Sequence, residues 1–185
     1  MHQPIVAVIG ASQTRAEDPD YHDAIRLGRL LAGAGYAVAS GGYGGLMEAV
    51  SAGAAEAGGR VIGVTAPTVF PGRPGANAHV TDERPAATIT ERIQDLLSIS
   101  DALVALPGSL GTLTELVVAW NIAFVAPFSS RQPMPIVTVG QTWAELVTLL
   151  TERLVTDGDL VQCVANVDEA AAAVQQHVTI RQNPV

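Results

Sequence analysis

Apolar residues along the chain fall into short, β-branched runs that alternate with longer segments in which apolar residues recur every three to four positions. The short runs end at glycine, proline or polar turns, as buried parallel strands do. Strands are expected at residues 4–9, 36–39, 61–65, 103–107 and 135–139, with a further apolar run at 160–165. The longer segments have helical spacing, and helices are expected at residues 21–34, 47–57, 88–100, 113–124, 142–154 and 168–177.

This alternation predicts an α/β fold: a doubly wound parallel sheet with helices on both faces, in a single domain over residues 1–185. In such sheets ligands bind at the carboxyl ends of the strands. The turns that follow the predicted strands are therefore the first places in which to look for a site.

Two segments depart from the alternation. Residues 66–85 contain four prolines and two glycines, too many breakers for a helix, and a loop of this length is often a lid or a binding loop. Residues 180–185 have no periodic pattern and are expected to form a frayed tail.

Composition narrows the functional classes. The formal net charge of −8 argues against binding long nucleic acid, whose phosphates require a basic face. A single cysteine, Cys163, excludes an internal disulfide, and the N-terminus lacks the pattern of a signal peptide. No apolar run reaches the roughly 18 residues that a membrane span needs, so a cytoplasmic protein without a membrane partner is expected.

All ten basic residues are arginines. The absence of lysine from the sequence removes the Walker A lysine and the lysine that forms a Schiff base with pyridoxal phosphate. The four histidines are scattered and none has a partner at ligand spacing, so no metal is expected; they are His2, His22, His79 and His177.

The stretch from Leu103 to Trp120 is the strongest candidate for a site. An apolar run stops at Pro107, turns through Gly108 and Gly111, and enters a helix near Thr112. Backbone N–H groups at such a helix start suit a phosphate. The alternative is that Thr112-x-x-Glu115 is a capping box, which would serve only the first turn of the helix.

Two other turns add small residues. Gly10-Ala11-Ser12 follows the first strand, so Ser12 is expected to touch a ligand. The second turn runs from Ser40 to Met47 and contributes Gly42, Gly44, Gly45 and Met47. Its spacing is not G-x-G-x-x-G, because Met47 stands at the third place after Gly44, and a nicotinamide cofactor is therefore not expected.

One carboxylate and one guanidinium complete the candidate site. Thr88-x-x-Glu91 is a capping box that leaves Glu91 in solvent, whereas Arg92 lies beside the apolar face of the same helix. Ser109 stands in a near match to a nucleophile elbow, but Pro107 occupies a required glycine position, so Ser109 is interpreted as a phosphate contact. Phosphate-binding turns beside Glu115 and Arg92 suit cleavage at a sugar carbon.

These motifs together resemble the LONELY GUY (LOG) family of cytokinin-activating phosphoribohydrolases, once mislabelled lysine decarboxylases. The resemblance rests on Gly-Gly-x-Gly-Gly-Leu-Met at 41–47, Glu91-Arg92, and Pro-Gly-x-x-Gly-Thr-x-x-Glu at 107–115, with matching spacing from Arg92 to Glu115. It covers most of the chain to about Leu150.

The resemblance implies a Rossmann-like fold, a homodimer, and hydrolysis of the N-glycosidic bond of a nucleoside 5′-monophosphate to free base and ribose 5-phosphate, without cofactor or metal. Arg92 and Glu115 match the essential arginine and glutamate of the family. The phosphate loop implied by the resemblance consists of Gly108, Ser109, Leu110, Gly111 and Thr112.

The sequence also departs from the family pattern. Ser109 stands for the second glycine of the phosphate loop, Thr114 for its first glutamate, and Ile93 for an upstream lysine, while Pro74 follows Arg73 where members tend to carry an acid. A related branch of the superfamily, the molybdenum-cofactor carriers, shares the glycine turns. Binding of a nucleotide or of molybdenum cofactor without turnover is therefore the alternative function.

The helix predicted from Leu113 to Phe124 is apolar on nearly all sides. A helix at the surface of a monomer has one polar face. The pattern therefore predicts that a second subunit covers this helix.

Overall fold

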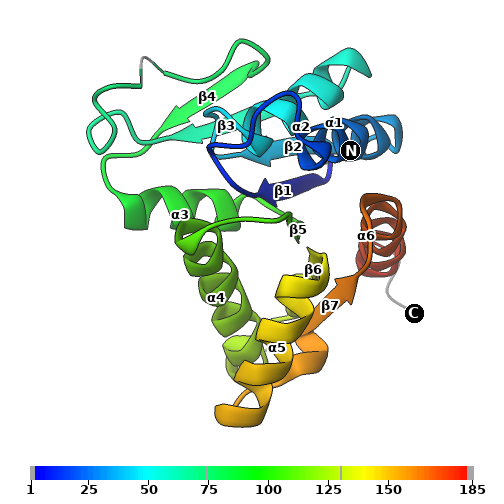
Figure 1. The fold of residues 1–185 in the computed structure, drawn as a ribbon. Helices are drawn as coiled ribbons and strands as arrows, with labels where there is room; N and C mark the ends of the chain where they lie inside the picture. Colours follow the sequence, from blue (N-terminus) through cyan, green and yellow to red (C-terminus); the bar gives the residue numbers. More distant parts are fainter. Residues whose placement is uncertain (1–2, 74, 130, 183–185) are drawn as a thin grey trace.

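The computed structural model describes residues 3–73, 75–129 and 131–182, without the side chains of residues 129 and 179–182. In this part of the chain, parallel strands form one sheet in the order β4-β3-β2-β1-β5-β6-β7 (Figure 1). The strands are β1 Ile5–Ile9, β2 Ala37–Ser40, β3 Val61–Thr65, β4 Asp82–Pro85, β5 Ala102–Ala105, β6 Ile136–Val139 and β7 Val161–Val164.

Helices follow the strands on both sides of the sheet (Figure 1). They are α1 Pro19–Gly33, α2 Leu46–Glu56, α3 Ile89–Ser98, α4 Leu110–Val125, α5 Gln141–Arg153 and α6 Val167–Gln182, with short 3-10 turns η1 Ala126–Ser129 and η2 Gly158–Leu160. The predicted α/β class and doubly wound parallel sheet are therefore confirmed.

Alternate residues of the central strands enter two separate cores. Val6 and Val8 of β1 pack with α1, α2 and α6, whereas Ile5, Ala7 and Ile9 pack with α3, α4 and α5. Strands buried on both faces read as continuous apolar runs, which is why the sequence identified them.

The sheet order reverses between β1 and β5. The chain builds β1 to β4 toward one edge, returns through α3, and adds β5 to β7 on the other side of β1. Loops that leave β1 and β5 in opposite directions open a crevice at the carboxyl ends of these two strands, the usual ligand position in this architecture.

Glycine sets the packing of α1 on α2. A Cβ atom at Gly28 would collide with the Val50 carbonyl, and one at Gly53 would collide with the Ile25 carbonyl. The two helix backbones therefore cross in direct contact, which keeps α2 close to the sheet and fixes the position of its N-terminus beside the crevice.

Two sequence predictions need correction. Residues 82–85, expected within a loop, form the edge strand β4; it is charged, and Asp82 pairs with Arg60 and Arg84, so apolar patterning could not reveal it. The expected frayed tail is helical through residue 182, because α6 continues to that point. Residues 183–185, the rest of that prediction, lie outside the described residues.

One helix has the length and mean hydropathy of a membrane span, although polar residues such as Thr112, Thr114 and Glu115 interrupt its apolar sequence. The continuous helix over Leu110–Phe128 meets both criteria, and 39% of it is buried within the chain. Leu116, Ala119 and Trp120 of this helix pack in the core against the sheet, while Val117, Ile122 and Val125 are exposed. It is thus a core helix with an uncovered apolar side.

Candidate functional site

Three strand-to-helix turns meet at the crevice between β1 and β5. The Leu106 amide donates to the Ile9 carbonyl at 2.9 Å, and the Ala11 amide donates to the Pro107 carbonyl at 3.1 Å. The Leu46 amide at the start of α2 donates to the Ala11 carbonyl at 2.9 Å. These backbone bonds hold Ser12 and Ser109 on opposite sides of one opening.

The glycines of the second turn shape the backbone. Gly45 has a φ of 69°, and a Cβ atom there would collide with the Ala11 carbonyl. Gly42 has a φ of 74° and lies against Thr65 and Gly63 of β3, away from the crevice. Both positions favour glycine because side chains rarely adopt this left-handed conformation.

Helix α4 begins earlier than the sequence pattern indicated. Ser109 is the N-cap without a side-chain cap bond, and Leu110 is the first helical residue. Thr112 therefore lies inside the first turn and Glu115 in the second, so the alternative interpretation of these two residues as a capping box is wrong. Glu115 is free to make a different contact.

That contact is a buried ion pair with Arg92 of α3. Arg92 Nη1 lies 3.1 Å from Glu115 Oε1, and the two side chains are 10% and 12% exposed. Arg92 Nε donates to the Val64 carbonyl at 2.8 Å, and Nη2 donates to Met47 Sδ at 3.8 Å. The guanidinium is thus fixed on several sides.

Gly41 makes room for this arginine. A Cβ atom at Gly41 would overlap Arg92 Nη2 and would also crowd Met47 Sδ. The second glycine turn therefore serves the site indirectly, because the absence of a side chain at Gly41 allows the guanidinium to reach Glu115.

Burial and the ion pair act in opposite directions on Glu115. Desolvation raises the pKa of its carboxyl above the ordinary range, while the charge and hydrogen bond of Arg92 lower it by a smaller amount. A raised carboxyl pKa next to a fixed cation, in a cleft, is typical of a functional site.

Thr112 presents a hydroxyl that no described residue satisfies. Its side chain is 2% exposed, and Oγ1 is buried without a hydrogen-bond partner among the described residues. Gly108 lies directly over it, because a Cβ atom there would collide with this hydroxyl. An unsatisfied buried hydroxyl costs about 1–3 kcal/mol and marks a place where a ligand oxygen would be favourable.

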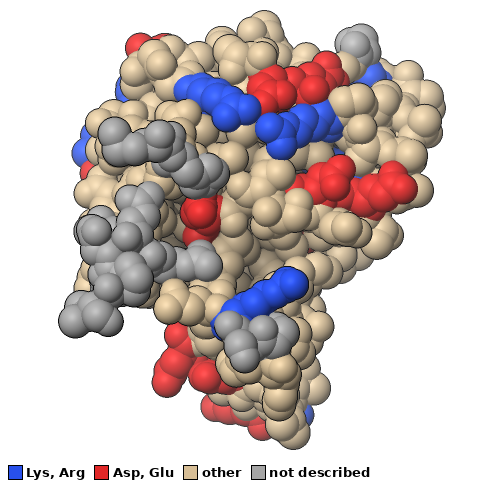
Figure 2. Space-filling model, turned by 180° about the vertical axis from the view of Figure 1, so that it is seen from behind, with Lys and Arg blue, Asp and Glu red and all other residues tan. Residues whose placement is uncertain are grey.

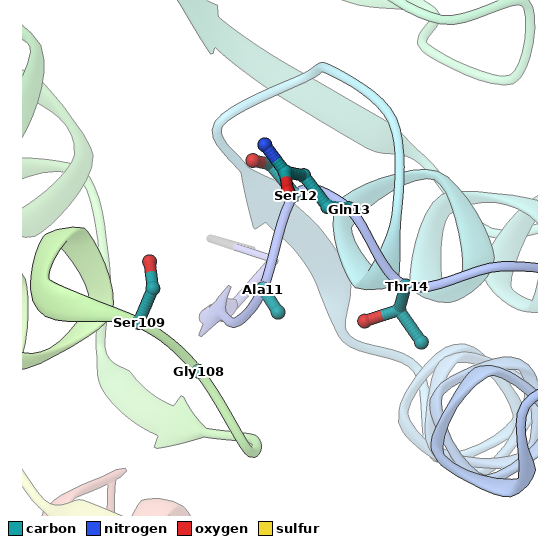
Figure 3. Close-up of a pocket in the computed structure, with 6 residues that line it drawn as sticks. All are labelled: Ala11, Ser12, Gln13, Thr14, Gly108 and Ser109. Carbon is teal, nitrogen blue, oxygen red and sulfur yellow. The ribbon is translucent and has the colours of Figure 1, made fainter.

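These groups line one pocket of ≈160 Å³. Its walls come from all three turns, from α3 and α4, and from the long loop after β3; they are Gly10, Ser12, Met47, Phe70, Arg73, Arg92, Ser109, Gly111, Thr112 and Glu115. A second pocket of ≈420 Å³ adjoins it through Ser12 and Ser109. Figure 3 shows the Ser109 hydroxyl on one side of that pocket and Ser12, Gln13 and Thr14 on the other, with Gly108 below.

Most of the predicted site residues thus line these two pockets, and four do not. Leu110 is 77% exposed on the outside of α4. Gly42, Gly44 and Gly45 belong to the walls of neither pocket, because they shape the turn that carries Met47. As predicted, Glu91 is exposed and closes the capping box with Thr88.

Two of the departures from the family pattern, Ile93 and Thr114, lie outside the pocket. Ile93 and Thr114 line an apolar groove of ≈580 Å³ between α3 and α4 that also contains Leu97, Val118 and Ile122. Ser109 remains at the pocket, whereas Pro74 lies outside the described residues. Two of the replaced charges would therefore stand beside this groove and not in the pocket.

Sequence reasoning missed Phe70 and Arg73. The expected binding loop was identified by its prolines, but the inward side chains were not. The Arg73 guanidinium carbon lies 4.7 Å from the ring centroids of both Tyr43 and Phe70, and the two rings meet edge to face. The available signal in the sequence was the presence of one aromatic residue, Phe70, and one cationic residue, Arg73, in a proline-rich loop that follows a parallel strand.

Charges on the surface are interleaved. On the face in Figure 2, described basic side chains lie beside acidic ones and form no continuous basic tract there. The exposed ion pairs Arg29–Glu56 and Arg26–Asp168 likewise place a basic side chain beside an acidic one.

Comparison with known proteins identifies relatives of two kinds. The family model described as "SLOG cluster4 family" matches residues 3–125, which run from β1 to the end of α4. A probable cytokinin riboside 5′-monophosphate phosphoribohydrolase of Oryza sativa is 40% identical over 104 residues, covering 54% of this chain and 45% of that protein. The corresponding enzyme of Mycobacterium tuberculosis is 33% identical over 122 residues, covering 65% of this chain and 64% of its own. The match thus spans about half of the rice protein and under two thirds of the mycobacterial one.

The second kind of relative comes from solved structures of molybdenum cofactor proteins. The molybdenum cofactor carrier protein of Chlamydomonas reinhardtii superposes with a TM-score of 0.74 at 28% identity, covering 96% of this chain and 99% of the carrier. The molybdenum cofactor binding protein of Rippkaea orientalis has a TM-score of 0.76 at 22% identity, covering 95% and 98%, and supports the fold alone.

Proposed function

The chain belongs to the SLOG cluster4 family, and from this premise we propose that it hydrolyses the N-glycosidic bond of a purine nucleoside 5′-monophosphate to free base and ribose 5-phosphate. The observation that carries the proposal is the buried Arg92–Glu115 pair on the wall of a pocket that also contains the start of α4. The names of the rice and mycobacterial relatives support the same reaction.

The phosphate would bind at the start of α4. The first amides of a helix have no intrahelical acceptor and carry partial positive charge. Gly111 and Ser109 line the pocket at this point, and the unsatisfied Thr112 hydroxyl lies beside them. These groups can donate to phosphate oxygens, and the absence of a Cβ atom at Gly108 leaves room for the Thr112 side chain.

Glu115 would act at the sugar. As the bond between C1′ and the base nitrogen breaks, the electron pair leaves with the base, which takes a proton from solvent, and positive charge develops on the ribose. The Glu115 carboxylate stabilises that charge and accepts a proton from the water whose oxygen bonds to C1′. Free base and ribose 5-phosphate are the products.

Arg92 would position this carboxylate. Its bonds to the Val64 carbonyl and to Glu115 leave the guanidinium little freedom. It also lowers the pKa of Glu115 against the effect of burial, so that a larger fraction of the carboxyl is ionised near neutral pH. We therefore assign it a positioning and electrostatic role.

Binding of molybdenum cofactor without turnover is the second candidate. The Chlamydomonas carrier matches nearly the whole chain at 28% identity, whereas the phosphoribohydrolases match about half to two thirds of it. A carrier would use the same helix start for an anionic group of its ligand and would need no general base at Glu115.

A base-release experiment separates the two candidates. Purified protein is incubated with AMP and with prenylated AMP, and free base and ribose 5-phosphate are measured by mass spectrometry. The proposal predicts release of both products in equal amounts. Tight nucleotide binding with no released base would favour the carrier, and a wider screen of nucleoside monophosphates would then identify no substrate.

A further inference from the structure

The charges in the pocket do not cancel. Arg92 and Glu115 neutralise each other, and Arg73 adds a second guanidinium to the same wall. We propose that Arg73 binds the phosphate of the ligand and makes the pocket select phosphorylated over unphosphorylated nucleosides. This inference rests on the proposed function for the class of ligand, and it concerns binding, so it does not require that the ligand is hydrolysed.

Arg73 is held in place by aromatic rings and by its own loop. Its guanidinium packs in the corner between Tyr43 and Phe70, 4.7 Å from each ring centroid, where cation–π attraction favours it. The Arg73 amide donates to the Phe70 carbonyl at 2.9 Å, and the Phe70 amide donates to the Ala66 carbonyl at 3.0 Å. A compact turn therefore holds Arg73 at the wall of the pocket.

The loop is anchored at both ends of this turn. Asn77 donates from Nδ2 to the carbonyls of Gly42 and Tyr43, at 3.1 and 3.0 Å, which ties the loop to the second glycine turn. Closer to its start, the Thr68 hydroxyl donates to the Ala87 carbonyl at 2.6 Å. Tyr43 contributes too, because its hydroxyl accepts the Ala66 amide at 2.7 Å. The loop that carries Arg73 is thus held to the rest of the chain by several hydrogen bonds.

No carboxylate neutralises Arg73 within the part of the chain that the structure describes. The nearby acid of the loop base, Glu83, accepts the Thr65 hydroxyl at 2.8 Å and the Ala76 amide at 3.1 Å. Most other described arginines form ion pairs, with Arg26, Arg29, Arg60, Arg84 and Arg92 each beside an acid. The charge of Arg73 is available to a ligand.

An anion is the ligand group that fits this position. Arg73 shares a pocket of only ≈160 Å³ with Ser109, Gly111 and Thr112 at the start of α4. A helix start and a guanidinium on the wall of one small pocket can together bind a phosphate, since a guanidinium can meet two phosphate oxygens at once. The chain has no lysine, so arginine must supply any such cation.

The test compares AMP with adenosine by calorimetry on the wild-type protein, Arg73→Gln and Arg73→Lys. Charge-assisted hydrogen bonds contribute about 1.5–3 kcal/mol, so Arg73→Gln should weaken AMP binding by roughly 10- to 100-fold. Adenosine affinity should change by less than about twofold on that account, and Arg73→Lys should retain part of the AMP affinity because it keeps the charge. Arg153→Gln, an exposed arginine at the end of α5, is the matched control and should change neither.

Equal weakening of AMP and adenosine by Arg73→Gln would overturn the proposal, because it would place Arg73 at the sugar or base or in support of the loop. Unchanged AMP affinity, or a wild-type protein with no preference for AMP, would overturn it as well. Absence of base release by the wild-type protein would count against the proposed reaction alone, since a protein that binds AMP without hydrolysing it still gives the ratio of the two affinities.

Discussion

Replacement of Arg92 by methionine should expose how strongly the site depends on the Arg92–Glu115 pair. The variant removes the cation and leaves the Glu115 carboxylate buried without its partner. Breaking a buried pair in this way costs about 3–5 kcal/mol, whereas an exposed pair contributes at most about 1 kcal/mol. For a chain of this size, 3 kcal/mol corresponds to a decrease in Tm of roughly 6–12 °C.

The loss should depend on pH in a defined direction. Burial already raises the pKa of Glu115, and removal of Arg92 takes away the two effects that lower it. A carboxyl whose folded-state pKa lies above its unfolded value destabilises the fold as pH rises through the interval between the two values, and it has no effect below the unfolded value. The difference in Tm between wild type and Arg92→Met should therefore be small near pH 4 and larger at pH 8.

Thermal unfolding of a set of variants at these two pH values tests the reasoning. Arg92→Met with Glu115→Gln should recover part of the lost stability at pH 8, because glutamine carries no charge to desolvate. Arg29→Met, which breaks an exposed pair with Glu56, is the matched control. A decrease in Tm for Arg92→Met no larger than that for Arg29→Met, or equal at both pH values, would refute the account of the pair.

Three further predictions concern the pocket and the uncovered helix. Thr112→Val should raise the free energy of unfolding by about 1 kcal/mol, since it removes an unsatisfied buried hydroxyl. The same variant should weaken AMP binding in calorimetry. Lower stability together with unchanged AMP binding would contradict this prediction. In a pH profile, kcat/KM should fall as pH decreases through the raised pKa of Glu115, above the range of an ordinary glutamate, and an acid limb within that range would argue against Glu115 as the base. Light scattering should show that the wild-type protein is a dimer, because the apolar side chains of Ile122 and Val117 on α4 are 47% and 42% exposed. Ile122→Asp should give a monomer, and a monomeric wild-type protein would refute the predicted dimer.

The fold was predictable where burial leaves a pattern. Central strands such as β1 are apolar throughout because both faces are covered, and amphipathic α3 and alanine-rich α2 show their helical spacing. The edge strand β4 was not predictable, because its residues Asp82–Pro85 face solvent on alternate positions and it depends on pairing with β3. Such a strand is determined by tertiary contacts.

The site was predictable in its chemistry more than in its geometry. Arg92 and Glu115 were identified by residue type and spacing, but the start of α4 depends on the extended backbone of Ser109, so the sequence pattern placed the first helical residue too late. Arg73 and Phe70 could not be placed, because their loop is oriented by contacts with Gly42 and Tyr43, which are distant in the sequence.

Base release by Glu115→Gln is the measurement that tests the central claim most directly. AMP binding and formation of free base are measured on the same preparations of wild-type protein and variant. The account predicts that the wild type releases base, and that the variant binds AMP with similar affinity but loses turnover, because glutamine can neither accept the proton nor stabilise the cationic ribose. A variant that releases base at the wild-type rate would contradict the assignment of Glu115 as the catalytic carboxylate.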